Sequence, residues 1–554
     1  MRHASQRWLV IALLVLIVLP TRLAIAHYLA TDAPGDGIVY AQIARNLLER
    51  HVYSHAAEPP YDPSLIRLPG YPLFLAGVYS LFGHQNNHAV RLVQAFIDTL
   101  TCVLAGFIGF AWEPDVELKR KTALAAFCIT AICPFAAIYV ATILTETIST
   151  FFAVALTLPA TIAFQATTTR RRIALWLATG VVSGAAVLFR PDSGLFAAAV
   201  GLTLVMTSLP RSASDNQSLR QRMVSTTAFG LLLSFGFCLV LLPWTIRNWR
   251  VFHLFQPLAP AHAEMPGEFV PYGYLSWLRT WIDDDRYIGP VLWNLDNLPI
   301  DPDDIPDRAF DSAEEKQEVE ALFEKYNYPP DEQTQLAAPA SAQDVDIPPE
   351  DYFRPAKEAE SMAANEESVP EEESDQEETD ENEQSVTEPH QDVEMTPVID
   401  AAFGRLAKER IARHPLRYVF LLPIKRGLSL WFDTHSGYYP FEGELLPLED
   451  LDYDIHQHIW LPLFVALTWI YSLMAVVGGW FLWRSRDFAA RRWLLLATLI
   501  IVLRVGFFSF LENPEPRYVV ELFPFVAILG GIGAVHLIQL IQLKNREVSE
   551  TATV

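Results

Sequence analysis

The chain has 554 residues, of which 51% are apolar, 12% aromatic and only 19% charged, and its mean hydropathy is positive at +0.19. Soluble globular proteins carry about 25% charged residues, so this composition indicates a membrane protein. The net charge of −24 comes from one segment, because residues 301–400 hold 33 acids against 5 bases and the remaining residues hold 32 acids against 36 bases. A nucleic-acid-binding protein is disfavoured, since the bases stand in short groups between apolar runs and form no continuous basic face.

Ten apolar segments approach the roughly 20 residues that a helix needs to cross a bilayer. They cover residues 8–28, 92–112, 122–141, 147–166, 173–189, 193–209, 223–243, 458–483, 493–511 and 517–542. If the N-terminus is inside, every basic cluster in a short connection falls on the inner side; these clusters lie at residues 119–121, 170–172, 211–222, 484–492 and 544–546. Cytoplasmic loops are enriched in Lys and Arg. The sequence therefore predicts an all-α polytopic membrane protein of about ten spans with both termini cytoplasmic.

The first apolar segment has two interpretations. Its basic start and the residues Leu23-Ala24-Ile25-Ala26 also fit a cleavable secretory signal. We expect an uncleaved anchor, because Arg22 stands near the outer end of the segment, where its side chain can reach the interface.

Two outer connections are long and divide the chain into three regions: residues 1–250, 251–456 and 457–554. The first connection, residues 29–91, contains an amphipathic run at 40–48 and a short apolar run, Tyr71–Phe82, which is too short to span and is expected to be interfacial or re-entrant.

The second connection, 251–456, contains the acidic segment 301–400, which is too polar to offset its chain entropy and is expected to be disordered. Residues 416–432 then predict an amphipathic interfacial helix broken at Pro423.

Conspicuous polar residues gather at the outer ends of the spans. They are Asp32, Asp36, Arg67, Glu146, Arg190, Asp192, Arg247, Arg250, Glu512, Glu515, Arg517 and Tyr518. Ionisable groups at a membrane boundary indicate a functional site. Arginine presents a planar fork of donors that matches phosphate oxygens, and a carboxylate can act as a general base toward a hydroxyl. The pattern predicts transfer of a group from a phosphate-linked lipid to an acceptor outside the cytoplasm.

The motifs carry a family resemblance. The runs GDGIVYAQIARNL (35–47) and RLPGYPLF (67–74) resemble the first outer loop of the GT-C membrane glycosyltransferases, in particular bacterial relatives of dolichyl-phosphate-mannose protein mannosyltransferases and of aminoarabinose lipid A transferases. The resemblance continues in LTET (144–147), PWTIRNW (243–249) and PRY (516–518), and it leaves residues 300–400 uncovered.

The resemblance implies an enzyme of a bacterial cytoplasmic membrane that moves a sugar from a polyprenyl-phosphate donor to a protein, lipid or glycan acceptor, with inversion at the anomeric carbon and an extracytoplasmic active site. Asp36 matches the family's general base, with Asp32 as the fallback, and Arg247 and Arg517 are the expected donor-phosphate ligands. The expected supporting residues are Arg67, Glu146, Tyr40, Tyr518 and Arg190.

Each of these residues also has an ordinary structural interpretation. Asp36 and Glu146 can cap helices, Arg247 and Arg517 can anchor spans at lipid headgroups, Arg67 can brace its loop, and Arg190 with Asp192 can form a turn pair.

The sequence does not specify a cofactor, because the outer histidines show no ligand spacing, although the outer acids could hold a divalent ion. Two other functions stay open: a transporter or flippase for a lipid-linked sugar, and an inactive subunit that binds the carrier. A transporter should show a polar path to the inner side, and the inner loops offer mostly basic clusters without matching acids inside the spans.

Overall fold

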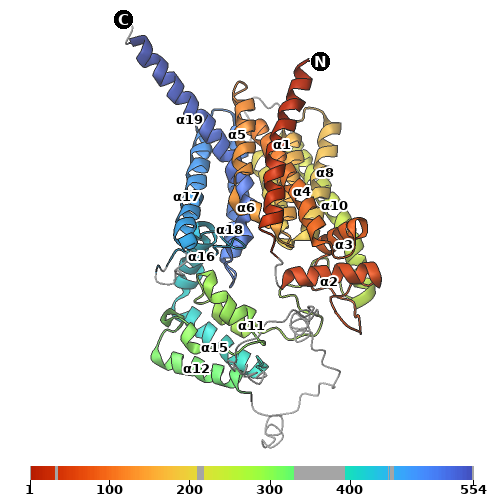
Figure 1. Cartoon of the computed structure of the whole chain (residues 1–554), viewed down its shortest axis with the longest axis vertical. Helices are drawn as coiled ribbons and strands as arrows, with labels where there is room; N and C mark the ends of the chain where they lie inside the picture. Colours follow the sequence, from red (N-terminus) through yellow and green to blue (C-terminus); the bar gives the residue numbers. More distant parts are fainter. Residues whose placement is uncertain are drawn as a thin grey trace, which may run out of the picture.

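The computed structural model describes residues 2–31, 35–208, 218–329, 393–446, 448 and 455–551. Every regular element within these residues is helical, which confirms the predicted all-α class. Figure 1 shows long helices packed side by side, with both chain termini at the same end of the molecule. The long connections therefore lie toward the opposite end.

Seven helices among the described residues are long and apolar enough to cross a membrane. They are α4 (Asn87–Trp112), α7 (Glu146–Gln165), α8 (Thr169–Phe189), α10 (Leu219–Phe252), α17 (Ile455–Arg484), α18 (Phe488–Ser509) and the segment Pro516–Arg546, which joins η9 (Pro516–Leu522) to α19 (Phe523–Thr551). An eighth span results if α5 (Lys119–Ala131) is joined to α6 (Pro134–Ala137) and η1 (Ile138–Ala141), which follow at a bend of 56°. Pro134 explains this break, because proline restricts the preceding residue and lacks a backbone N–H.

The other two predicted spans are also helical but do not meet the same criterion. Helix α9 (Gly194–Ser208) has 15 residues, about 22 Å of helix against a hydrocarbon core of about 30 Å. In α1 (Arg2–Tyr28) the apolar stretch with described side chains begins at Val15. All ten predicted segments therefore coincide with helices. Seven of these helices, or eight spans with the bent pair, meet the criterion for crossing a membrane.

Helices α8 and α10 approach each other closely through glycines. A Cβ at Gly180 would lie 2.1 Å from the carbonyl oxygen of Leu233, and one at Gly236 would lie 2.6 Å from that of Leu177. Small residues permit such close packing between helices in membranes. This contact holds α8, whose last residue precedes Arg190, against α10.

The first outer connection contains α2 (Asp36–Glu49) and α3 (Gly70–Phe82), as the two sequence patterns predict. Both lie at the end of the molecule opposite to the termini (Figure 1). A Cβ at Gly70 would lie 2.6 Å from the carbonyl oxygen of Leu188 in α8. Glycine at this position lets α3 begin directly against the end of α8.

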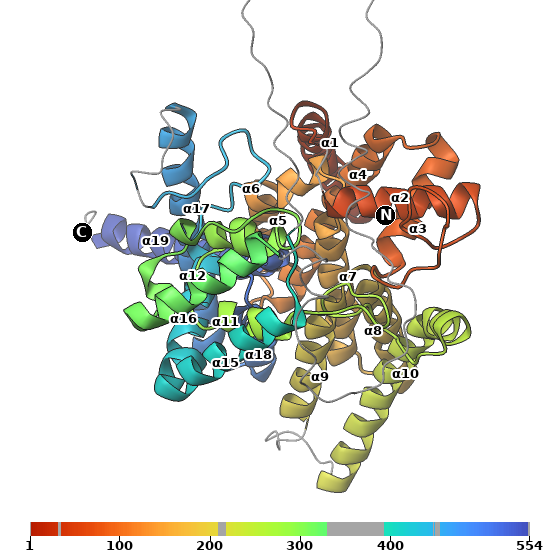
Figure 2. The ribbon, with the colours of Figure 1, turned by 90° about the horizontal axis from the view of Figure 1, so that it is seen from below.

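The second long connection forms a compact body that we call the outer helical unit: α11 (Tyr272–Leu278), α12 (Ala313–Asn327) and α15 (Pro397–Arg413). Figure 1 shows this unit below α16 and α18, and Figure 2, seen from below, shows it on the other side of the molecule from α2 and α3. Its core contains the buried side chains of Trp277, Trp281, Phe323, Tyr326 and Phe403.

The prediction of disorder over 301–400 is wrong at both ends of that segment. Residues 301–329 and 393–400 contribute η5 (Pro302–Asp304), η6 (Asp307–Ala309), α12 and the start of α15. The physical reason is that α12, although rich in Glu, buries one apolar face that includes Val319 and Leu322. Residues 330–392 lie outside the described residues.

The predicted interfacial helix at 416–432 consists of a π-helical turn, η7 (Arg417–Leu421), followed by α16 (Leu422–Phe432). Pro423 stands in the first turn of α16, where its missing N–H is tolerated. Phe420, Ile424 and Leu428 are exposed and form an apolar surface. This surface fits the predicted position at a membrane interface.

Arg22 differs from its expected role. It is only 4% exposed, and its Nε lies 2.5 Å from Asp98 Oδ2 of α4, so it does not reach toward the interface. Burying two charges is tolerated only when they compensate each other. The ion pair therefore fastens α1 to α4.

We predict that Arg22→Met lowers the stability of the folded protein by about 3–5 kcal/mol, because it leaves the buried Asp98 carboxylate without its partner. The measurement is the Tm of purified protein in detergent. The double variant Arg22→Met/Asp98→Leu should recover most of the loss. An unchanged Tm in the single variant would contradict the role of this pair.

Candidate functional site

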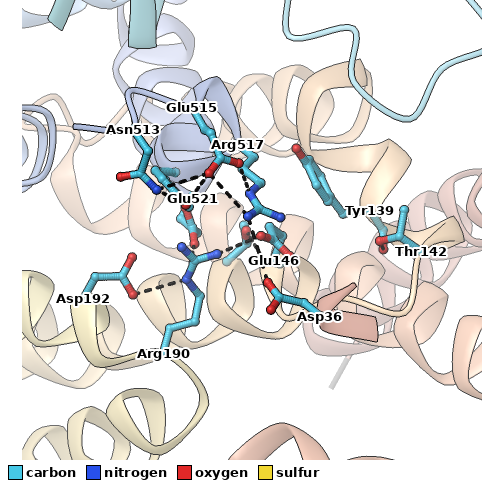
Figure 3. A network of polar contacts seen from close by, with 12 residues as sticks. Asp36, Tyr139, Thr142, Glu146, Arg190, Asp192, Asn513, Glu515, Arg517 and Glu521 are labelled. Atoms are coloured by element: carbon cyan, nitrogen blue, oxygen red, sulfur yellow. Dashed lines mark hydrogen bonds and ion pairs between the residues drawn. The ribbon is translucent and has the colours of Figure 1, made fainter. Parts of the chain in front are cut away.

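Most of the predicted outer residues meet in one group of charged side chains, part of which is shown in Figure 3. We call this group the charge cluster; it consists of Asp36, Arg67, Glu146, Arg190, Asp192, Arg504, Glu515, Arg517 and Glu521. The members come from α2, the loop before α3, α7, the turn between α8 and α9, α18, and η9 with the residue before it. Six separate parts of the chain are thus held together by ion pairs.

Asp36 is the first residue of α2, and its carboxylate points toward arginines. The N-cap position is occupied by Gly35 at φ 71°, a conformation that suits glycine. Arg67 Nη2 donates a 2.6 Å hydrogen bond to Asp36 Oδ1, and Arg517 Nη2 lies 4.0 Å from Oδ2. Asp36 is therefore not the N-cap residue of α2, and its carboxylate is paired with arginines instead.

The electrostatics of Asp36 follow from these contacts. Burial raises the pKa of Asp36, but the nearby Arg67 and Arg517 outweigh that effect and leave its pKa below the ordinary value. Asp36 is therefore an ionised acceptor at neutral pH.

Arg190 lies at the centre of the buried part of the cluster. Its Nη1 donates to Glu146 Oε1 at 2.8 Å, and its Nε donates to Asp192 Oδ1 at 3.2 Å and lies 3.7 Å from Glu521 Oε1. Arg504 Nη2 in turn lies 2.8 Å from both Asp192 and Glu521. Burial raises the pKa of Asp192, yet Arg190 and Arg504 lower it below its ordinary value.

Arg517 forms the opposite side of the cluster from Arg190. Its Nε is ion-paired with Glu515, and its guanidinium stands 5.3 Å from the centre of the Tyr518 ring. The Tyr518 hydroxyl donates to Glu515 and accepts a 3.0 Å hydrogen bond from Asn513 Nδ2. These contacts fix the direction of Arg517.

Exposure separates the cluster into a buried part and an open edge. The open edge consists of Asp36, Arg67 and Arg517, whose side chains are 34%, 25% and 21% exposed. Arg190 is 12% exposed and Arg504 is fully buried. A ligand that approaches the cluster therefore meets one carboxylate flanked by two guanidinium groups.

The remaining predicted residues occupy different positions. Tyr40 packs edge-to-face on Tyr71 with ring centres 5.1 Å apart, and burial raises its pKa, so it is a neutral hydroxyl near Asp36. Glu146 is buried beneath the open edge and bonded to Arg190. Asp32, the fallback base, lies outside the described residues.

The structure does not bring Arg247 into the charge cluster. Its Nη1 donates to the Ser64 carbonyl at 2.7 Å, and its Nη2 donates to the Tyr53 carbonyl at 3.3 Å. Its guanidinium also lies about 5 Å from the rings of Tyr53 and Trp244. Arg247 therefore braces the first outer loop, which contains Arg67, through backbone carbonyls.

Sequence reasoning missed Arg504 and Glu521. Arg504 lies inside the apolar segment 493–511, and Glu521 lies inside the segment 517–542. The apolar length of these segments predicts spans only. A charge within such a segment is expensive unless it is paired. That rule, applied residue by residue within the spans, would have identified both.

A separate acidic group within the described residues has suitable spacing for a metal ion. Ligand atoms of Asp284, Asp285 and Glu444 lie within 4.8 Å of one another. Burial and the neighbouring acids raise the pKa of Asp285 to about 8 and that of Glu444 to about 10. Arg286 lies 3.3 Å from Asp284 and 3.7 Å from Glu444, so part of the negative charge is already compensated.

A comparison with protein families supports the resemblance drawn from the motifs. Residues 62–244 match the family described as dolichyl-phosphate-mannose-protein mannosyltransferase. The match covers about a third of the chain and includes Arg67, Glu146 and Arg190. No curated protein sequence matches the chain.

Two solved membrane proteins show distant structural similarity. The archaeal oligosaccharyltransferase AglB from Archaeoglobus fulgidus, in complex with an inhibitory peptide and a dolichol-phosphate, has 13% identity and a TM-score of 0.39 over 97% of this chain and 52% of AglB. The chain thus spans about half the length of AglB. ArnT from Cupriavidus metallidurans bound to undecaprenyl phosphate has 13% identity and a TM-score of 0.33 over 96% of this chain and 78% of ArnT. Both TM-scores are below 0.5.

We predict that the stability contributed by Asp36 depends on pH in a specific direction. Because the pKa of Asp36 is lowered on folding, its ion pairs stabilise the protein fully above its ordinary pKa of 3.8 and lose this effect as the pH falls through the lower folded value. Asp36→Asn should therefore have a lower Tm than wild type at pH 7, and the two Tm values should converge below pH 4. An equal difference at pH 3 and pH 7 would show that the ion pairs do not stabilise the fold.

Proposed function

We propose that the protein is a membrane glycosyltransferase that moves a sugar from a polyprenyl-phosphate donor to an acceptor at the open edge of the charge cluster. The observation that carries this proposal is the Asp36 carboxylate flanked by Arg67 and Arg517, at the exposed side of a group that is otherwise buried. The family match over residues 62–244 supports the same class of reaction.

Asp36 is the general base in this proposal. The acceptor hydroxyl oxygen attacks the anomeric carbon from the face opposite to the phosphate, so the configuration inverts. Asp36 takes the hydroxyl proton, the bond between the anomeric carbon and the phosphate oxygen breaks, and the polyprenyl phosphate leaves with the bonding electrons. Proton transfer of this kind typically contributes 10²–10⁴-fold in rate.

Arg517 and Arg67 bind the donor phosphate in this proposal. Guanidinium groups match phosphate oxygens and stabilise the charge that grows on the leaving group. Phosphate competes with Asp36 for both arginines. Its binding therefore reduces the cationic compensation of Asp36, raises the pKa of this carboxylate and makes it a better base.

The remaining predicted site residues act by support. Arg190 and Glu146 hold the floor of the site, Tyr518 and Tyr40 line its sides, and Arg247 secures the loop that carries Arg67. No step of the proposed reaction needs a metal ion.

We propose an extracytoplasmic active site in a bacterial cytoplasmic membrane. Both termini lie at the end of the molecule away from α2 and α3 (Figure 1). Successive spans cross the membrane in alternate directions, so the short basic connections fall on the same side as the termini. With the ten predicted spans, the positive-inside rule supports cytoplasmic termini and a charge cluster on the outer side. The polyprenyl donor enters from the surrounding lipid, and the acceptor is a protein, lipid or glycan.

The transporter alternative requires acids along a path through the membrane. Two buried acids stand in or next to a span: Asp98 within α4, and Glu113, the residue that follows it. Asp98 is paired with Arg22, whereas Glu113 accepts from Thr122 and lies 3.1 Å from His536 at the inner end of the bundle. Both acids have structural partners, so they do not favour transport.

The test is sugar transfer by the purified full chain in liposomes, with a panel of radiolabelled polyprenyl-phosphate sugars and a membrane extract that supplies acceptors. Asp36→Asn should lower turnover by at least about 10²-fold, because the base is lost. The matched control is Asp62→Asn, since Asp62 is an exposed acid of the same outer loop and should tolerate the change with normal turnover.

Normal turnover by Asp36→Asn would refute its role as the base. Movement of the carrier across the bilayer without any transfer would instead support the flippase. Absence of both activities with every donor would leave the carrier-binding subunit or a donor or acceptor outside the panel.

A further inference from the structure

The loop between α18 and η9 connects the charge cluster to another part of the molecule. We call residues 510–515 the site loop. At one end of this loop, Glu515 is ion-paired with Arg517 and accepts the hydroxyl hydrogen bond of Tyr518. The direction of Arg517 therefore depends on where the site loop lies.

The other end of the site loop is bound to the outer helical unit. Glu512 is 5% exposed, and its Oε2 accepts a 2.6 Å hydrogen bond from Arg279 Nε. Arg279 follows the last residue of α11. An ion pair therefore joins the outer helical unit directly to the loop that precedes Arg517.

A buried arginine of α16 fixes the backbone on both sides of this ion pair. Arg426 of α16 is 2% exposed and donates to the carbonyls of Ile282 at 2.7 Å, Arg279 at 2.6 Å and Ser509 at 3.5 Å. Burial lowers the pKa of Arg426 to about 10, so it still carries its charge at neutral pH. Arg426 thus holds the end of α11 next to the end of α18.

We propose that Arg279 is a positioning residue that sets the place of Arg517 at the open edge through Glu512, so that docking of the outer helical unit controls binding of the donor phosphate. This inference rests on the proposed role of Arg517 in phosphate binding. Glu512 and Arg517 are five residues apart, and Glu515 between them is held by side chains of the cluster. A short loop held at both ends transmits a displacement of one end to the other.

The probe for this inference is undecaprenyl phosphate, bound to the full chain in nanodiscs. Arg517→Met should abolish binding. Arg279→Met should weaken binding roughly tenfold, since a misplacement of about 1 Å can cost up to 10²-fold. Arg279→Lys should restore most of the affinity, because it keeps a cation within reach of Glu512.

The matched control is Lys425→Met. Lys425 Nζ lies 2.9 Å from Asp283 Oδ2, so this pair joins α16 to the segment after α11 without a contact to the site loop. Its loss should leave the affinity unchanged. Glu512→Gln breaks the same ion pair from the other side, and it serves as the test if Arg279→Met does not fold.

Hydrogen exchange distinguishes positioning from a general loss of structure. In Arg279→Met the amides of residues 510–518 should exchange faster, while those of α7 keep their wild-type protection. Wild-type affinity in Arg279→Met and Glu512→Gln, together with lost binding in Arg517→Met, would overturn the inference and leave the proposed function standing. Equal weakening by Lys425→Met would also overturn it. Absence of binding by the wild type would overturn the phosphate role of Arg517, and the inference with it.

Discussion

The arrangement of the helices at the end of the bundle away from the termini depends on mutual compensation of buried charges. Arg190 and Arg504 share the carboxylates of Asp192 and Glu521, and Arg190 also binds Glu146. A buried charge without a partner is strongly destabilising. Each of these side chains therefore has a single favourable position, and the ends of α7, α8, α18 and η9 are fixed relative to one another.

This constraint also explains why chemistry is expected at one edge of the group. The buried members are ion-paired with one another, whereas Asp36, Arg67 and Arg517 retain exposed surface. The first outer loop contributes two of these three residues, and it is held in place by Gly70 against α8 and by Arg247 through its carbonyls. A rigid bundle thus supports a small polar surface that a phosphate and a hydroxyl can reach together.

The sequence predicts the elements well because the relevant signals are local. Apolar length and basic connections locate the helices, and the motif around Asp36 identifies one half of the open edge. The sequence predicts Arg247 as a phosphate ligand, and the structure does not bring it into the charge cluster. In a sequence, an arginine at the outer end of a span looks the same whether its side chain binds a phosphate or a backbone carbonyl. Only tertiary packing distinguishes these two, since the carbonyls of Tyr53 and Ser64 come from a loop almost 200 positions away.

Two further predictions, the disorder at the two ends of segment 301–400 and the interfacial position of Arg22, were wrong because they depended on composition and chain position. The acidic excess of residues 301–400 concealed the apolar face of α12, because an average over the segment does not record helical spacing. The position of Arg22 near a span end predicts a side chain at the membrane interface. Its partner Asp98 lies inside the apolar run of α4, and the ion pair between them keeps Arg22 buried. Both errors come from judging residues by their neighbours in the chain.

The most direct test of the central claim is an experimental structure of the protein in lipid with undecaprenyl phosphate bound. The account predicts the phosphate within hydrogen-bond distance of Arg517 and Arg67, with the Asp36 carboxylate released from at least one of them. A phosphate bound at Arg247 or elsewhere on the molecule, with the pair between Asp36 and Arg67 unchanged, would contradict it.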